Sequence, residues 1–277
     1  MLAVPAQWVG PIYQFEEILR AAGRPKTTRY LRIYHLRRFA VDHPRTDPFE
    51  ITKAHLRTWM AQHDWAPSTR ASYRSSLCVF YAWAHADGHM PTNPAYELPT
   101  ITPPPAVPRP APDAVVDDAL RNVALRTRVM VTVLAFTGLR RHEAAKLHTR
   151  DLEWLGDGWV IRVDGKGRRK RIIPVDDEFA AVLRALPPGY VFPGQIDGHL
   201  SAAHFGKVVS AALEGSWTAH NLRHRFASSA YAVEKDIRAV QELLGHAHVT
   251  TTQIYTWVPS ESMRRAAAGS RRGLDAA

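Results

Sequence analysis

Apolar side chains in the first 97 residues recur every three or four positions, as on one face of an amphipathic helix. Polar stretches with Gly or Pro separate these segments, and Gly88 closes the last of them. No run alternates apolar and polar residues as a half-buried strand would. The pattern therefore predicts four helices, at Ile12–Ala22, Thr28–Val41, Thr52–His63 and Ser68–Asp87.

The pattern is mixed in the second part of the chain. An apolar helix at Arg126–Phe136 is expected to end in the turn Thr137-Gly138-Leu139, and another helix to run over Arg140–Leu147. Trp159–Val163 and Arg168–Val175 flank a Gly-rich turn, which predicts a β-hairpin. Further helices are predicted at Asp176–Leu186, Ser201–Leu213, His220–Val233 and Asp236–Leu244, around Tyr255, and at Pro259–Ala268.

Leu98–Pro112 separates the two parts with seven prolines in fifteen residues. Proline at this density interrupts both helices and sheet ladders, so an extended, semi-rigid linker is expected. The sequence thus predicts a helical domain over residues 1–97, a linker over 98–112 and a second domain over 113–277. The fold class is mainly α, with a small antiparallel β-sheet in the second domain.

Charge points to a polyanionic partner. The formal net charge is +10 and the isoelectric point about 10.0, with Lys and Arg in excess in both parts of the chain. Nucleic acid is the first candidate, and a generic basic surface is the alternative. Cys78 is the only cysteine, which excludes an intrachain disulfide and fits a cytoplasmic protein. No window approaches 18 consecutive apolar residues, so no membrane span is expected.

No cofactor or metal is predicted from the motifs. Val160 occupies the position of the first glycine in a phosphate-binding G-x-x-x-x-G-K-[ST] loop before Gly165-Lys166. His220 and His224 have the i,i+4 spacing of zinc ligands, but no third ligand stands out.

Five short strings remain as candidate chemistry: Thr137–Glu143, Gly165-Lys166-Gly167, His220–His224, Leu244-Gly245-His246 and Thr251–Tyr255. Each also has a structural interpretation. Arg140 could form an ion pair with Glu143, and Tyr255 could be a core residue. Lys166 begins a basic run that could be a solvated strand, and a histidine can occupy a helix start or a loop.

Together, in this order, the five strings resemble the tyrosine recombinases, or phage integrases. Residues 137–143 resemble that family's first arginine box and residues 220–224 its H-x-L-R-H box. Leu244-Gly245-His246, with Tyr255 nine residues later, resembles its third box and nucleophile. The resemblance implies the catalytic residues Arg140, Lys166, His220, Arg223, His246 and Tyr255, with Glu143 in support. It also implies that residues 12–97 are a SAM-like, core-binding domain and that the organisation is Xer-like, without an additional arm-binding domain.

The activity implied by the resemblance is site-specific recombination of double-stranded DNA through a 3′-phosphotyrosine, by a homotetramer on synapsed DNA. Two arginines can stabilise the charge that develops on the nonbridging phosphate oxygens. His220 and His246 can donate hydrogen bonds to the same oxygens, and Lys166 can protonate the leaving 5′-oxygen. A type IB topoisomerase and a non-catalytic DNA-binding regulator are the alternatives, and phage integrases and other recombinase subclasses are not separated.

Basic residues outside the five strings are candidates for phosphate contacts. The first group, on polar faces of the predicted helices, consists of Arg29, Arg32, Arg37, Lys53, Arg57, Arg70 and Arg74. The second group follows Lys166 on the hairpin and consists of Arg168, Arg169, Lys170 and Arg171. Solubility alone is the alternative role for the first group.

Overall fold

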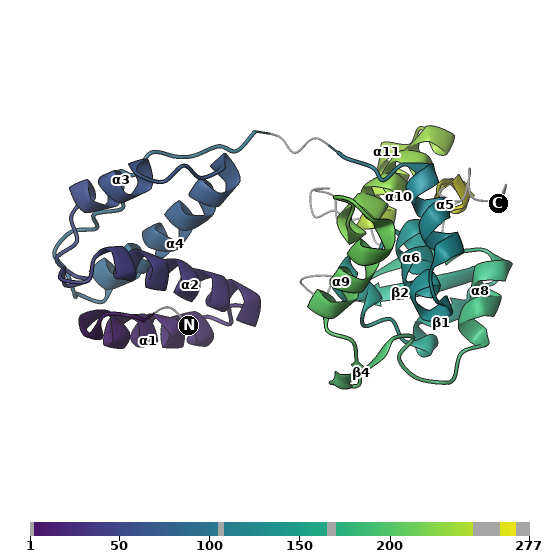
Figure 1. Cartoon of the computed structure of the whole chain (residues 1–277), viewed down its shortest axis with the longest axis horizontal. Helices are drawn as coiled ribbons and strands as arrows, with labels where there is room; N and C mark the ends of the chain where they lie inside the picture. Colours follow the sequence, from purple (N-terminus) through teal and green to yellow (C-terminus); the bar gives the residue numbers. More distant parts are fainter. Residues whose placement is uncertain (1–2, 105–107, 165–169, 246–260, 270–277) are drawn as a thin grey trace. The chain divides into compact units, whose positions relative to one another are not determined.

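The computed structural model of the chain describes residues 3–104, 108–164, 170–245 and 261–269. It consists of two compact units, which divide between Ala106 and Val107, inside the proline-rich segment (Figure 1). The predicted fold class is confirmed: the chain is mainly helical, with a three-stranded antiparallel sheet in the second unit.

The first unit contains four helices: α1 (Ala6–Ala21), α2 (Lys26–Asp42), α3 (Lys53–Ala61) and α4 (Pro67–Ala86). Their apolar faces enclose an aromatic core that includes Trp8, Phe39 and Phe80, all fully buried. The first helix starts six residues before the predicted Ile12, and Pro11 lies inside it. Burial of Trp8 explains the longer helix, because its indole packs on Phe39 and donates a hydrogen bond to the Thr46 carbonyl at 3.0 Å.

The second unit contains the sheet and the remaining helices. Its described elements, in chain order, are α5 (Asp113–Asn122), α6 (Leu125–Thr137), α7 (Arg141–Ala144), the 3-10 helix η1 (Thr149–Asp151), β1 (Leu152–Trp154), β2 (Trp159–Asp164), β3 (Lys170–Val175), α8 (Asp177–Arg184), β4 (Pro193–Ile196), α9 (Ala202–Leu213), α10 (Ala219–Glu234), α11 (Ile237–Leu244) and α12 (Glu261–Ala268). Helix α6 is central and contacts α5, α9, α10 and β3.

The predicted hairpin is present. Strands β2 and β3 pair antiparallel from Trp159↔Val175 to Asp164↔Lys170, and β1 adds to the other edge of β2. Several elements differ from the prediction. Helix α5, the 3-10 helix η1 and the short strands β1 and β4 were not predicted, and the helix expected over Arg140–Leu147 is only the single turn α7. Leu147 instead accepts a backbone hydrogen bond from Val191, which draws the chain away from a helical path.

Both ends of the expected linker pack against the units that they leave. Leu98 is buried in the first core, and its carbonyl accepts two hydrogen bonds from Arg74 on α4. Ala111 is buried in the second core, and its backbone N–H donates to Asn221 on α10. Both ends of the predicted linker therefore belong to the packed units. Within the described ranges, no helix is both long and apolar enough to cross a membrane.

Candidate active site

A left-handed turn presents Arg140. Helix α6 ends at Gly138, whose φ of +60° is a conformation that favours glycine. A Cβ at Gly138 would lie 2.4 Å from the Phe226 ring, so packing against α10 also requires glycine there. Thr137 fixes the turn, because its hydroxyl donates to the Val133 carbonyl and accepts from the Leu139 N–H. Arg140 follows as the N-cap of α7.

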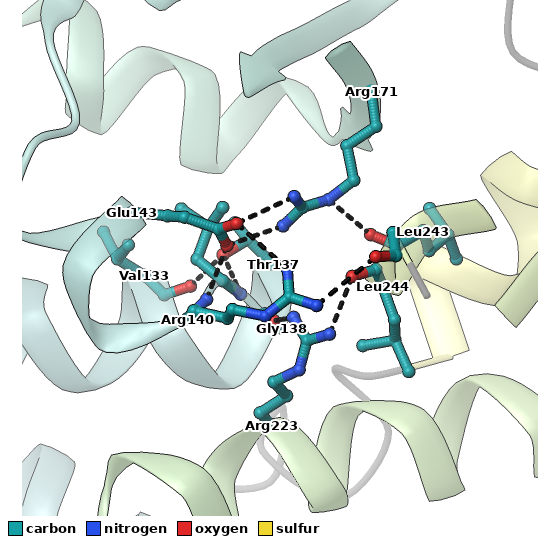
Figure 2. Close-up of polar contacts among 11 residues, drawn as sticks. Val133, Thr137, Gly138, Arg140, Glu143, Arg171, Arg223, Leu243 and Leu244 are labelled. Carbon is teal, nitrogen blue, oxygen red and sulfur yellow. Dashed lines mark hydrogen bonds and ion pairs between the residues drawn. The ribbon is translucent and has the colours of Figure 1, made fainter. Parts of the chain in front are cut away.

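Glu143 is the carboxylate at the centre of the site (Figure 2). Its side chain is 2% exposed. It accepts hydrogen bonds from the Arg140 backbone N–H at 2.8 Å and from Arg140 Nη1 at 3.1 Å. Burial would raise the pKa of this carboxyl, but Arg171, followed by Arg140, lowers it to about 2. Glu143 is therefore ionised at neutral pH and holds Arg140 in place.

Arg223 enters the same cluster from α10. Its residue is 6% exposed, and it donates to the Gly138 carbonyl at 2.6 Å and to the Leu244 carbonyl at 2.7 Å. Burial, with the positive charges of Arg140 and Arg171, lowers its pKa to about 9, so it remains charged at neutral pH. Two of its five N–H groups are occupied by these carbonyls, which leaves donors for an anion.

The C-terminus of α11 binds all three arginines. Arg171 donates to the Leu243 carbonyl at 2.9 Å, Arg223 to Leu244, and Arg140 to Gly245 at 3.3 Å (Figure 2). Carbonyls in the last turn of a helix lack partners within the helix and carry its negative dipole end, which suits cations. Three guanidinium groups and one carboxylate leave the cluster with an excess of positive charge.

His220 lies at the start of α10, three residues before Arg223, so both lie on one helix face. Thr218 caps this helix by accepting from the His220 N–H. The His220 residue is exposed and its ring contacts His224, with 4.4 Å between centroids. In the part of the chain that the structure describes, no group of three or more His, Cys, Asp and Glu residues could hold a metal ion.

The cluster brings together Arg140, Glu143 and Arg223, with His220 on the same helix as Arg223. The Arg140 side chain is 31% exposed, so an anion can reach its guanidinium from solvent. Five predicted site residues lie outside the described residues: Lys166, Arg168, Arg169, His246 and Tyr255. His246 directly follows Gly245 in sequence, where α11 ends in a left-handed cap.

Arg171 corrects one expectation. The basic run placed it on a DNA-facing strand, but its side chain is 8% exposed and makes an ion pair with Glu143. Successive strand residues face opposite sides, so Arg171 shares a face with Ile173, which is fully buried. No sequence signal indicated this, because Ile172 on the opposite face of the strand is buried as well. Lys170, the preceding residue, is exposed.

Several candidate DNA-contact residues of the first unit bind their own chain. Arg32 donates to the Ser75 carbonyl, Arg70 to the His63 carbonyl and Arg74 to the Leu98 carbonyl. Lys53 pairs with Glu97, while Arg57 is exposed on α3. These contacts hold four of the predicted DNA-contact side chains, those of Arg32, Lys53, Arg70 and Arg74, against their own unit.

Comparisons with known proteins identify the family. The phage integrase family matches residues 114–261. The tyrosine recombinase XerC of Xanthomonas axonopodis pv. citri (strain 306) is 34% identical over 227 residues, which are 75% of this chain and 74% of that protein. XerC of Xylella fastidiosa (strain 9a5c) is 33% identical over 231 residues, covering 74% of this chain and 76% of its own.

Solved structures agree on the fold. The integrase from mycobacterium phage Brujita has a TM-score of 0.54 at 26% identity, covering 95% of this chain and 93% of its own. A lambda integrase dimer bound to a COC′ core site has a TM-score of 0.69 at 19% identity, covering 87% and 74%. A lambda integrase tetramer bound to a Holliday junction has a TM-score of 0.68 at 18% identity, covering 89% and 80%.

The choice among the three interpretations of the sequence follows from these matches. The XerC relatives favour a recombinase over a type IB topoisomerase or a non-catalytic regulator. The chain belongs to the phage integrase family, and it is a site-specific tyrosine recombinase that breaks and rejoins DNA strands.

Proposed function

We propose that Arg140 and Arg223 bind the scissile phosphate of double-stranded DNA and that Tyr255 is the nucleophile. The observation that carries this proposal is the convergence of the two guanidinium groups on the C-terminal turn of α11, immediately before His246 in sequence. Attack on a phosphodiester adds negative charge to its nonbridging oxygens, and preorganised arginines stabilise that charge.

The proposed step exchanges one phosphate ester bond for another. The Tyr255 oxygen bonds to phosphorus, and the bond from phosphorus to the 5′-oxygen breaks. The phenolic proton passes to a base such as His220 or His246, and Lys166 gives a proton to the departing 5′-oxygen. The products are a 3′-phosphotyrosine and a free 5′-hydroxyl. Attack by a 5′-hydroxyl on the phosphotyrosine reverses the step and rejoins a strand, so the covalent link conserves the bond energy without ATP.

The direct test needs a DNA site. We suggest using this chain to select its core site from a pool of DNA duplexes with constant ends and a randomised central segment. The duplex recovered in this way is called the selected duplex below. A nick near the cleavage position makes it a suicide substrate, on which a covalent protein–DNA adduct accumulates. Failure of the wild-type chain to form an SDS-resistant adduct on any selected sequence would contradict the proposed chemistry.

We further propose that both units contact DNA phosphates, which is consistent with the net charge of +10. Binding of the full-length chain to the selected duplex should then weaken by about 10³–10⁵ between 50 and 200 mM salt, as six to ten phosphate contacts imply. A fragment of residues 1–106, the first compact unit, should show a shallower slope of log affinity against log salt. Equal slopes for the two proteins would mean that the second unit adds no phosphate contacts.

The third part of the proposal is a homotetramer on synapsed DNA, supported by the tetrameric lambda integrase complex. In this part of the proposal, helix α12 docks on a neighbouring subunit. In the structure it packs on its own domain, with Met263 and Ala267 buried and Arg264 paired with Asp157. Assembly through the buried face of this helix would therefore require it to leave α10 and β3.

Truncation after Val258 removes α12 and should weaken synapsis more than binding to a single site. The reason is that single-site binding needs the phosphate contacts of one subunit, whereas synapsis also needs contacts between subunits. Gel-shift titrations with one and with two duplexes separate the two quantities, and a thermal melt checks that the truncated chain is folded. A loss of the same size in both titrations would argue against a role of this helix in assembly.

A further inference from the structure

The guanidinium of Arg171 makes three hydrogen bonds inside the protein. Nη1 and Nη2 donate to the two oxygens of Glu143 at 3.0 and 2.8 Å, and Nε donates to the Leu243 carbonyl at 2.9 Å. The side chain is 8% exposed. These contacts leave no fork for a DNA phosphate, so the role of Arg171 must be sought within the protein.

The three contacts join elements that are far apart in sequence. Glu143 on α7 is 28 residues before Arg171, and Leu243 on α11 is 72 residues after it. The same carboxylate holds the backbone and guanidinium of Arg140, and the same helix end accepts from Arg140 and Arg223. Arg171 is therefore bound to both supports of the phosphate-binding arginines (Figure 2).

Close packing reinforces this arrangement. A Cβ at Gly245 would lie 2.9 Å from Arg171 Cδ, and Gly245 has a φ of +62°. Glycine is thus required both by the left-handed helix end and by the approach of the Arg171 stem. The aliphatic part of the Arg171 side chain thus lies against Gly245, the residue before His246 in sequence.

Stability alone is a weak explanation for such a buried pair. A buried ion pair has a large desolvation cost, and well-packed neutral residues often replace it without loss of stability. The planar fork of arginine, in contrast, gives a carboxylate a defined orientation that a lysine ammonium cannot give. The bidentate geometry therefore indicates that the main role of Arg171 is to orient the Glu143 carboxylate.

We propose that Arg171 is a positioning residue for strand cleavage: through Glu143 and the Leu243 carbonyl it fixes the site that holds Arg140 and Arg223. This inference rests on the proposed assignment of those two arginines to the scissile phosphate. Because reacting groups lose about 10²-fold in rate when they are misplaced by roughly 1 Å, Arg171→Lys should slow cleavage by about that factor. Affinity for the selected duplex should stay within about twofold, since the Arg171 side chain is 8% exposed and its bidentate fork is occupied by Glu143.

The experiment measures two quantities on the nicked selected duplex: affinity, and the single-turnover rate of adduct formation at saturating protein. It compares wild type, Arg171→Lys, the double variant Glu143→Gln/Arg171→Met, and Arg162→Gln. The double variant replaces the buried ions by neutral groups and is therefore expected to fold, which a thermal melt checks. Arg162→Gln is the matched control, because Arg162 lies on the adjacent strand β2 and pairs with Glu153 at 2.5 Å with both side chains 38% exposed.

A substrate with sulfur as the bridging 5′-atom tests whether the defect lies in protonation of the leaving group or elsewhere in the site. Sulfur leaves without a proton, so it rescues defects in the general acid but not defects at the nonbridging oxygens. Slow cleavage with unchanged affinity, no rescue by sulfur and a wild-type rate for Arg162→Gln would support the proposal.

Four results would overturn the inference. The first is cleavage at the wild-type rate by Arg171→Lys or by the double variant, and the second is a loss of affinity in Arg171→Lys as large as its loss of rate. The third is rescue of Arg171→Lys by the sulfur substrate. The fourth is unfolding of both variants, which would mean that Arg171 acts on stability. In each case adduct formation by wild type on the same duplex keeps the proposed function intact. Absence of that adduct would instead reject the proposed function.

Discussion

Tyr255→Phe should bind the selected duplex as wild type does and form no covalent adduct with it. The phenolic oxygen is the atom that bonds to phosphorus in the proposed step, and phenylalanine removes only that atom. Loss of the adduct should therefore be complete, whereas the phosphate contacts that supply affinity are unchanged. SDS gels of reactions on the nicked duplex measure the adduct, and gel shifts measure binding.

The matched control is Tyr231→Phe. Tyr231 lies on α10 of the same unit and the residue is 43% exposed, so its hydroxyl can be removed without disturbing the core. This variant should form adduct at the wild-type rate. An adduct that persists in Tyr255→Phe would assign the nucleophile to another residue, and peptide mapping of the DNA-linked fragment would identify it.

Lys166→Ala should cleave normal DNA about 10²–10⁴-fold more slowly than wild type, the range expected when general-acid catalysis is lost. The leaving 5′-oxygen departs poorly as an alkoxide, whereas a bridging sulfur departs readily without a proton. The variant should therefore recover most of its rate on the 5′-bridging phosphorothioate. Single-turnover cleavage of the two substrates measures both effects.

Arg140→Ala provides the contrast for Lys166→Ala. Its guanidinium is held by Glu143 and the Gly245 carbonyl and is proposed to act on the nonbridging oxygens. Those oxygens are the same in both substrates, so Arg140→Ala should stay slow on each. If Lys166→Ala is equally slow on normal and sulfur-containing DNA, Lys166 is not the acid, and a histidine or a water molecule would have to supply the proton.

Local pattern was sufficient for most of the secondary structure. The four helices of the first unit, the hairpin of β2 and β3, and the caps at Gly138 and Gly245 follow from periodicity and turn residues, which act over a few positions. The boxes around Arg140 and Arg223 were likewise visible as short strings in a fixed order. Helix α5 was missed because it directly follows the prolines, and β1 because three residues carry little periodic signal.

The sequence by itself determined the two-part helical organisation, the basic charge and the family, because these depend on composition, spacing and motif order. Only the tertiary structure decided that Arg171 belongs to the protein interior and that three arginines converge on successive carbonyls of α11. Whether a strand arginine meets DNA or a carboxylate depends on what packs over that face of the strand. Here Glu143 and Leu243 come from 28 and 72 residues away, beyond the reach of any local pattern.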